Sequence, residues 1–267
     1  MKNSPYNDYY RYLAAEVISP FYNIRLKNLY SLKLTNVLKR KNPYLFKAKN
    51  FDLAGDLVKS IIDAFLSSQE ETIFGNLLEG FAIYVAQELY GGFKSNLKSV
   101  DLEFEREGIY YIVGIKSGIY WGNSDAIAKM RDNFKSAKMI LHQRGILSDI
   151  QAVNGCIYGK ERSPLKTNID PDRNYYKYAG QDFWFFISGD DNLYHKIITP
   201  IDQEAHQKDE TFKKVYSSKV NEMTQEFMER FMTDNQIDWL KLVDFVSKRD
   251  KASDRSSYPD PRKQLRK

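Results

Sequence analysis

One stretch decides the fold of this chain: Val100-Asp-Leu-Glu-Phe-Glu-Arg-Glu-Gly-Ile-Tyr-Tyr-Ile-Val-Gly-Ile-Lys116. Apolar residues recur at every second position on either side of the pair Glu107-Gly108, which is the pattern of two strands joined by a two-residue turn. The stretch therefore predicts a β-hairpin whose register is set by that turn. The expected pairs are Arg106 with Ile109, Glu105 with Tyr110, Glu103 with Ile112, and Asp101 with Gly114.

The predicted register brings charged side chains together, because directly opposed residues share one face of a hairpin. One face is expected to carry Asp101, Glu103, Gly114 and Lys116, and the other Val100, Leu102, Val113 and Ile115. Carboxylates are ligands that Mg²⁺ takes, and a lysine beside them orients an attacking water or helps to deprotonate it. An ordinary solvated strand face has the same alternation, so the pattern alone leaves both interpretations open.

The residues before the hairpin have the period of helices. Apolar residues recur at helical spacing from Asp8 to about Lys41, and Pro20 is expected to end one helix and begin another. After a break at Asn42-Pro43, a helix is expected over residues 52–65 with Asp52 as its N-cap. A second is expected over residues 70–89, ending at Gly91-Gly92.

The residues after the hairpin alternate between helix and strand. The pattern predicts a helix at 124–142, a buried strand at 152–158, a polar loop at 160–174, a core-packed aromatic run at 183–187, and helices at 210–231 and 238–246. This order predicts an α/β fold, a mixed β-sheet core flanked by α-helices with extra N- and C-terminal helices. The expected division is an N-terminal helical arm at 1–41, a core at 42–247, and a charged, disordered tail at 248–267.

Composition excludes several classes of protein. The 40 Lys and Arg against 35 Asp and Glu give a net charge of +5, which suits a polyanionic partner without demanding one. The single cysteine, Cys156, excludes an internal disulfide, and the three histidines add too few ligands for a Cys/His zinc cluster. Because the sequence has neither a signal-peptide pattern nor a long apolar run, we expect a cytoplasmic protein that does not contact a membrane.

Several motifs resemble one known family in their order and spacing. They are Asn42-Pro-Tyr-Leu-Phe-Lys-Ala-Lys-Asn50, LSSQEETIFGNLLEG at 66–80, Val100-Asp-Leu-Glu-Phe104, GIKSGIYWGNS at 114–124 and YAGQDFWFFISG at 178–189. Over residues 40–235 the chain resembles the PmeII-like type II restriction endonucleases of the PD-(D/E)XK nuclease superfamily. The resemblance implies a restriction-endonuclease-like fold and Mg²⁺-dependent, sequence-specific cleavage of double-stranded DNA. It also implies that Asp101 binds the metal and that Lys116 is the motif lysine.

The chain departs from this pattern at Gly114, where the family motif has an acid two residues before the lysine. Glu79, on the helix before the hairpin, is the preferred replacement, because similar nucleases often carry an active-site glutamate there. Glu103 on the hairpin is the second candidate, so the expected metal ligands are Asp101, Glu79 and Glu103. Gly114 is expected to leave space that a carboxylate from the helix fills. A salt-bridged surface glutamate is the alternative for Glu79.

Contacts to DNA are expected on both sides of the helix that follows the lysine strand. The loop before this helix brings small residues and amides to a helix N-terminus, where a phosphate binds well, and basic residues follow on the helix and in the later loop. The candidates are Ser117, Trp121, Asn123, Ser124, Lys135, Lys160 and Arg162, with Lys129, Arg131, Lys138, Lys166, Asn174, Lys177 and Gln181 as weaker ones. An inward-packed Trp121 and solvated basic surfaces explain the same residues equally well.

The expected partners follow from cleavage of a palindromic site. A two-fold site is matched by a homodimer, for which the N-terminal helices are the candidate interface, although core packing also explains their apolar residues. A DNA methyltransferase is expected in the same system, without a required contact. A structure-specific or repair nuclease of the same superfamily is one alternative. A DNA-binding module that has lost catalysis is the other, and Gly114 motivates it.

Overall fold

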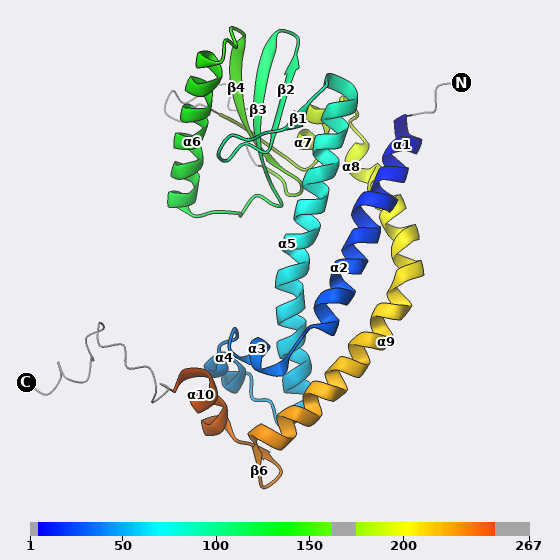
Figure 1. The fold of residues 1–267 in the computed structure, drawn as a ribbon, viewed down its shortest axis with the longest axis vertical. Helices are drawn as coiled ribbons and strands as arrows, with labels where there is room; N and C mark the ends of the chain where they lie inside the picture. Colours follow the sequence, from blue (N-terminus) through cyan, green and yellow to red (C-terminus); the bar gives the residue numbers. More distant parts are fainter. Residues whose placement is uncertain (1–4, 162–174, 249–267) are drawn as a thin grey trace, which may run out of the picture. The chain divides into compact units, whose positions relative to one another are not determined.

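The computed structural model describes residues 5–161 and 175–248, so the expectations for Arg162, Lys166, Asn174 and the tail from 249 lie outside it (Figure 1). The chain divides into two compact units. The first contains the residues up to Asn28 together with Ser68–Lys214, and the second contains Leu29–Ser67 and the residues from Val215 onward. The sheet and every described candidate residue belong to the first unit.

The first unit is built on a five-stranded mixed sheet with the strand order β1-β2-β3-β4-β5. The first three strands pair antiparallel, and β3, β4 and β5 pair parallel, which confirms the predicted mixed sheet. The strands are β1 (Phe93–Lys94), β2 (Leu102–Arg106), β3 (Ile109–Lys116), β4 (Asp149–Cys156) and β5 (Tyr176–Ala179).

The hairpin of β2 and β3 has the predicted turn and register. Glu107 and Gly108 have φ values of 54° and 75°, the left-handed conformation that a two-residue hairpin turn requires at both positions. Three predicted pairs are confirmed, Arg106 with Ile109, Glu105 with Tyr110, and Glu103 with Ile112. The fourth predicted pair, Asp101 with Gly114, does not form, because the backbone N–H of Asp101 donates at 2.8 Å to the oxygen of Val113, which already pairs with Leu102.

Helices cover both faces of the sheet (Figure 1). On one face, α6 (Ser124–Gln143) buries Phe134 and Leu141 against Ile112 of β3 and Ile150 of β4. On the other, α5 (Ala54–Tyr90) and α7 (Gln181–Ser188) contribute Tyr90 and Phe186, whose ring centroids lie 5.2 and 5.6 Å from that of Phe104 in β2. The sheet is therefore the middle layer of a three-layer unit, as an α/β fold requires.

Val100 was expected to share a face with Leu102, Val113 and Ile115, and this is wrong. Val100 belongs to the buried cluster under α6, together with Ile112 and Phe134. Ser99 before it has a φ of 61°, and regular β2 structure begins only at Leu102. The period of two therefore does not extend back to Val100.

The prediction that Pro20 separates two helices is also wrong. Helix α1 (Pro5–Tyr12), a π-helical segment (Leu13–Ile18) and α2 (Ser19–Tyr30) form a continuous helical run. Proline lacks an N–H and its ring crowds the preceding turn. The wide π turn relieves this crowding, and within it the N–H of Ser19 bonds to Ala14 O, five residues back.

The two helices predicted over 52–65 and 70–89 are one helix, α5 (Ala54–Tyr90), of 37 residues. The intervening residues Ser67 and Ser68 lower helix propensity, but neither Gly nor Pro is present there to stop the helix. The predicted end is confirmed, because Gly91 takes a φ of 66° and its neighbour Gly92 donates to Ala86 O. Helix α9 (Ile198–Phe231) likewise begins earlier than the predicted residue 210.

In the second unit, short helices are fixed by side-chain caps. The Asn42 carboxamide oxygen accepts from the N–H groups of Tyr44 and Leu45 at the start of α4 (Pro43–Ala48). Asp238 accepts from Lys241 N at the start of α10 (Trp239–Ser247). The remaining elements of this unit are α3 (Leu34–Leu38), β6 (Met232–Thr233) and β7 (Gln236–Ile237).

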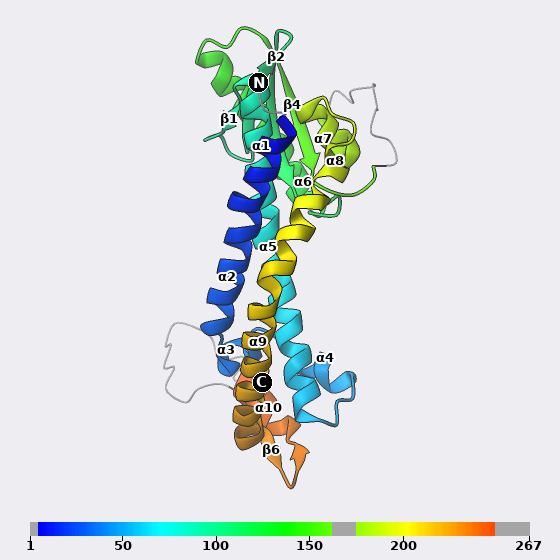
Figure 2. The same ribbon diagram turned by 90° about the vertical axis from the view of Figure 1, so that its right-hand side faces the viewer.

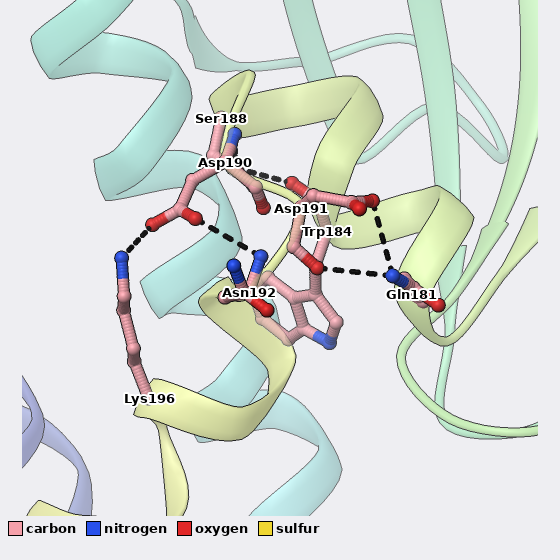
Figure 3. A network of polar contacts seen from close by, with 7 residues as sticks. All are labelled: Gln181, Trp184, Ser188, Asp190, Asp191, Asn192 and Lys196. Carbon is pink, nitrogen blue, oxygen red and sulfur yellow. Dashed lines mark hydrogen bonds and ion pairs between the residues drawn. The ribbon is translucent and has the colours of Figure 1, made fainter.

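A polar network joins α7 to α8 (Leu193–Lys196), and both views of the ribbon place these two helices side by side (Figures 1, 2 and 3). The Asp190 carboxylate accepts from Lys196 Nζ at 2.5 Å and from Asn192 N at 2.9 Å. The Gln181 amide donates to the backbone oxygen of Asp191 at 3.1 Å and to its carboxylate at 3.0 Å. The Lys196 hydrogen bond lowers the pKa of Asp190 below its usual value. These contacts fix the first residue of α7, which lies at the end of β5.

The aromatic run at 183–187 forms most of α7. Phe183, Trp184 and Phe186 are buried, and only Phe185 is exposed, so the predicted core packing is confirmed for three of the four rings. Trp184 Nε1 donates to Ile157 O at 2.9 Å, which ties α7 to the end of β4.

No helix in the described part of the chain has the length and apolar character to cross a membrane.

Candidate functional site

The structure brings Asp101 and Lys116 together where β2 begins and β3 ends. The Asp101 carboxylate oxygen Oδ2 accepts from the backbone N–H of Ile115 at 2.7 Å and lies 3.5 Å from Lys116 Nζ. The Asp101 and Lys116 side chains are 24% and 29% exposed, so both are held in place and still reachable from solvent. The backbone of β3 thus orients the aspartate, while the second carboxylate oxygen stays available for a ligand.

Glu79 reaches the same centre from α5. Its side chain is 20% exposed and lies 3.5 Å from Lys94 Nζ of β1. The pKa of Glu79 is raised, first by burial and then by the negative charge of Asp101, while Lys94 and Lys116 oppose the shift. Glu79 therefore lies close to the negative charge of Asp101, in a place where water solvates its carboxylate only weakly.

Glu103 is engaged elsewhere. It is 3% exposed, and its two carboxylate oxygens accept from Ser95 Oγ at 2.6 Å and from the Tyr110 hydroxyl at 2.8 Å. Burial and the hydrogen bond to Glu103 raise the pKa of Tyr110, so the phenol stays a donor. Both oxygens of Glu103 therefore have partners inside the α6 side of the sheet.

The space expected at Gly114 is filled, which corrects that expectation. A Cβ at Gly114 would lie 2.7 Å from the backbone oxygen of Ser99 and 3.1 Å from the ring of Phe134. The left-handed backbone of Ser99 is held by a 2.6 Å hydrogen bond from Asn133 of α6 to its hydroxyl. A glycine is thus required here by close packing, and no carboxylate from α5 occupies this place.

We predict that Gly114→Ala lowers the free energy of unfolding by about 1–3 kcal/mol, because the added methyl group meets a backbone atom that cannot rotate away. Gly55→Ala is the matched control. Gly55 lies in helix α5, and a Cβ added there would have Thr224, at 3.9 Å, as its contact. That variant should be more stable than the wild type by about 0.5–1 kcal/mol. Urea unfolding measures both, and a Gly114→Ala protein as stable as the wild type would contradict the packing described above.

The acidic pair fits a magnesium ion. Mg²⁺ is held in many sites by one or two carboxylates, with water and substrate phosphate completing its shell. Asp101 and Glu79 supply two such groups. The pKa of Glu79 is raised by burial and then by repulsion from Asp101, and a cation between the two carboxylates would offset that repulsion. Within residues 5–161 and 175–248, no group of three or more Asp, Glu, His and Cys side chains is arranged to hold a metal ion. The fit therefore rests on two carboxylates and not on the three expected.

The candidate DNA-binding residues occupy different settings. Ser117 directly follows the lysine and is half-buried, Trp121 packs against the buried cluster under α6, and Asn123 caps α6 by accepting from Ala126 N at 3.0 Å. Ser124, Lys135 and Lys160 are exposed. The N-terminus of α6 is thus partly satisfied by the chain itself, and the exposed lysines are the described candidates free to meet a phosphate.

Two features of the site were not predicted from the sequence. Lys94 pairs with Glu79 from a two-residue strand that has no periodic signal of its own. A cavity of about 1000 Å³ lies beyond the carboxyl ends of β3, β4 and β5, and is lined by Gly75, Ser117, Tyr158, Gln181 and Tyr194 among others. Because Ser117 follows Lys116, this cavity begins next to the candidate centre, at the edge where open α/β sheets bind their ligands.

A mixed sheet between helices, with an aspartate, a glutamate and a lysine meeting at the hairpin, defines an α/β protein with a site suited to phosphodiester chemistry. The family model of Type II restriction endonuclease EcoO109I matches residues 8–209, and the chain belongs to this family. Membership implies a nuclease that hydrolyses DNA. No curated protein matches the chain. The finer resemblance to the PmeII-like enzymes stays a prediction.

Proposed function

We propose that this protein is a Mg²⁺-dependent type II restriction endonuclease that cuts both strands of DNA at a specific sequence. The observation that carries the proposal is the convergence of Asp101, Lys116 and Glu79 at one end of the hairpin. The family supplies the substrate class, and the site supplies the groups that such a reaction needs.

Asp101 and Glu79 are proposed to hold the metal ion. When bound, Mg²⁺ would neutralise charge on the scissile phosphate and lower the pKa of a coordinated water. The backbone N–H of Ile115 holds the Oδ2 atom of Asp101 in place. Because the carboxylate is planar, this bond also fixes the position of the Oδ1 atom, which is proposed to bind the metal. Lys94 balances the charge of Glu79 from the solvent side. Glu103 is left out of this assignment, because both its oxygens already accept hydrogen bonds.

Lys116 is proposed to stabilise the transition state. Its ammonium group lies beside Asp101 and donates to Ile115 O at 2.7 Å, which leaves donors for the attacking water or a phosphate oxygen. A cation at this position stabilises the transition state more than the bound substrate, because negative charge develops on the phosphate as the bond breaks. Exposed Lys135 and Lys160 are proposed to neutralise flanking phosphates.

A homodimer is proposed as the working form, with the helices before residue 41 as its interface, because one site per strand cuts a two-fold sequence. PmeII-like specificity and a DNA methyltransferase that protects the host belong to the same proposal. A DNA-binding module without catalysis is the second candidate, and the absence of an acid at position 114 favours it.

Incubation of the purified protein with plasmid DNA and MgCl₂, followed by sequencing of the ends, tests the proposal. We expect discrete fragments that share one sequence at their ends and that disappear with EDTA. Non-specific or junction-dependent cutting would favour a repair nuclease. Binding to DNA without any cleavage would favour the inactive module.

A further inference from the structure

The segment between β3 and α6, residues 117–123, carries an indole next to the candidate lysine. Lys116 Nζ lies 5.7 Å from the centroid of the Trp121 ring. Trp121 is partly buried and packs against the hydrophobic cluster under α6, which contains Phe134 and Met130. The ring is thus wedged between the core and the ammonium group.

Close packing fixes the backbone on both sides of this ring. A Cβ at Gly118 would lie 2.6 Å from the Tyr158 ring, so the segment runs directly against the residue that follows β4. A Cβ at Gly122 would lie 3.0 Å from Ala126, and Asn123 closes the segment as the N-cap of α6. The segment therefore has little freedom to move the indole.

The Lys116 ammonium has neighbours of three kinds: the carbonyl oxygen of Ile115, the carboxylate of Asp101 and the face of Trp121. A lysine side chain has four rotatable bonds and loses much entropy when it is held in one place. A cation within about 6 Å of an aromatic centroid is attracted to the ring, and tryptophan attracts it most strongly. The indole supplies this attraction without occupying a donor of the ammonium group.

We propose that Trp121 is a positioning residue that holds the Lys116 ammonium beside Asp101, and that it acts through the lysine and not by contact with DNA. This rests on the proposed function of Lys116. The packing of the partly buried Trp121 ring against the α6 cluster supports the claim that it does not contact DNA, because a ring that stacks on bases needs an open face.

The kinetic test compares Trp121→Leu, Trp121→Phe and the control Tyr120→Leu on a duplex that contains the mapped cleavage site. Tyr120 is the neighbouring aromatic residue and is 94% exposed. We expect Trp121→Leu to lower kcat by about tenfold, with the Kd for DNA in Ca²⁺ changed by less than about twofold. Trp121→Phe should restore most of kcat, because it keeps an aromatic face. Tyr120→Leu should match the wild type in kcat.

Two kinetic outcomes overturn the proposal. A Kd raised in proportion to the loss of kcat/KM would make Trp121 a DNA contact. A Trp121→Leu protein that is folded, as shown by circular dichroism, and cuts like the wild type would mean that the lysine needs no aromatic support.

A fluorescence test needs neither DNA nor cleavage. The chain has three tryptophans, Trp121, Trp184 and Trp239. Lys116→Met should change the tryptophan emission of the wild-type background and leave that of the Trp121→Phe background unchanged, because only Trp121 faces the ammonium group. Equal changes in both backgrounds, or none in either, would overturn the contact. A wild-type protein that cuts no DNA would contradict the proposed function. The fluorescence comparison would still show whether the Lys116 ammonium group contacts the Trp121 ring.

Discussion

Lys116→Ala is expected to slow Mg²⁺-dependent DNA cleavage by roughly a thousandfold, the upper range for losing one group that stabilises developing charge. Single-turnover cleavage of a duplex with the mapped site measures the rate. The Kd for the same duplex, measured in Ca²⁺, should change by only a few-fold. The expectation follows from the place of the ammonium group, which lies beside Asp101 and has donors left over. Such a group serves the transition state more than the bound substrate.

Lys98→Ala is the matched control for the loss of one positive charge. Lys98 is an exposed lysine in the segment before β2, three residues from Asp101. Its removal should affect cleavage only through a small, salt-dependent change in Kd. If Lys116→Ala lost binding and cutting to the same extent, the lysine would be a phosphate contact and not a catalytic residue.

The hairpin was predictable because its determinants are local. Glu107-Gly108 specifies the turn, the turn specifies the register, and the register pairs Leu102, the residue after Asp101, with Val113 of the strand that ends in Lys116. The helix at 124–142 was predictable for the same reason, since its apolar period lies in one short stretch. Local signals of this kind need no knowledge of the rest of the fold.

The features that the sequence did not reveal depend on packing between distant residues. Ser99 fills the space beside Gly114 because its left-handed backbone is held by Asn133, 34 residues away in the chain. Glu103 looked equivalent to Asp101 in the hairpin alternation, yet Ser95 and Tyr110 enclose it. Periodicity assigns a residue to a face, but partners on other elements decide whether a carboxylate on that face is free.

Glu79 illustrates the same limit from the helix side. The apolar neighbours of Glu79 did not fix the direction of its side chain, and a salt-bridged glutamate was the alternative interpretation. In the structure both descriptions hold, because Glu79 pairs with Lys94 and also interacts electrostatically with Asp101 and Lys116. Only the placement of α5 against the strand edge brings these four residues into one site.

The second large effect is expected for Glu79, the proposed replacement for the acid that is missing at position 114. Glu79→Gln is expected to lower cleavage on the order of a hundredfold or more, the scale of a lost catalytic charge, because glutamine keeps the shape and removes a metal-binding carboxylate. The variant should also need more Mg²⁺ for half-maximal activity. Lys94→Gln serves as a control, since it removes the partner of Glu79 and leaves the carboxylate in place.

Glu103→Gln should lower the stability of the protein and leave its cleavage activity almost unchanged, the opposite of what we expect for Glu79→Gln. Its carboxylate accepts two buried hydrogen bonds, so replacing one acceptor with an amide donor should lower the free energy of unfolding by about 1–2 kcal/mol. Cleavage at a temperature where the variant is folded should stay within a few-fold of wild type. Urea unfolding and single-turnover cleavage of the two variants, measured in parallel, rank the acids. A larger loss of cleavage in Glu103→Gln than in Glu79→Gln would place the second acid on the hairpin, and two mild losses would mean that neither glutamate holds the metal.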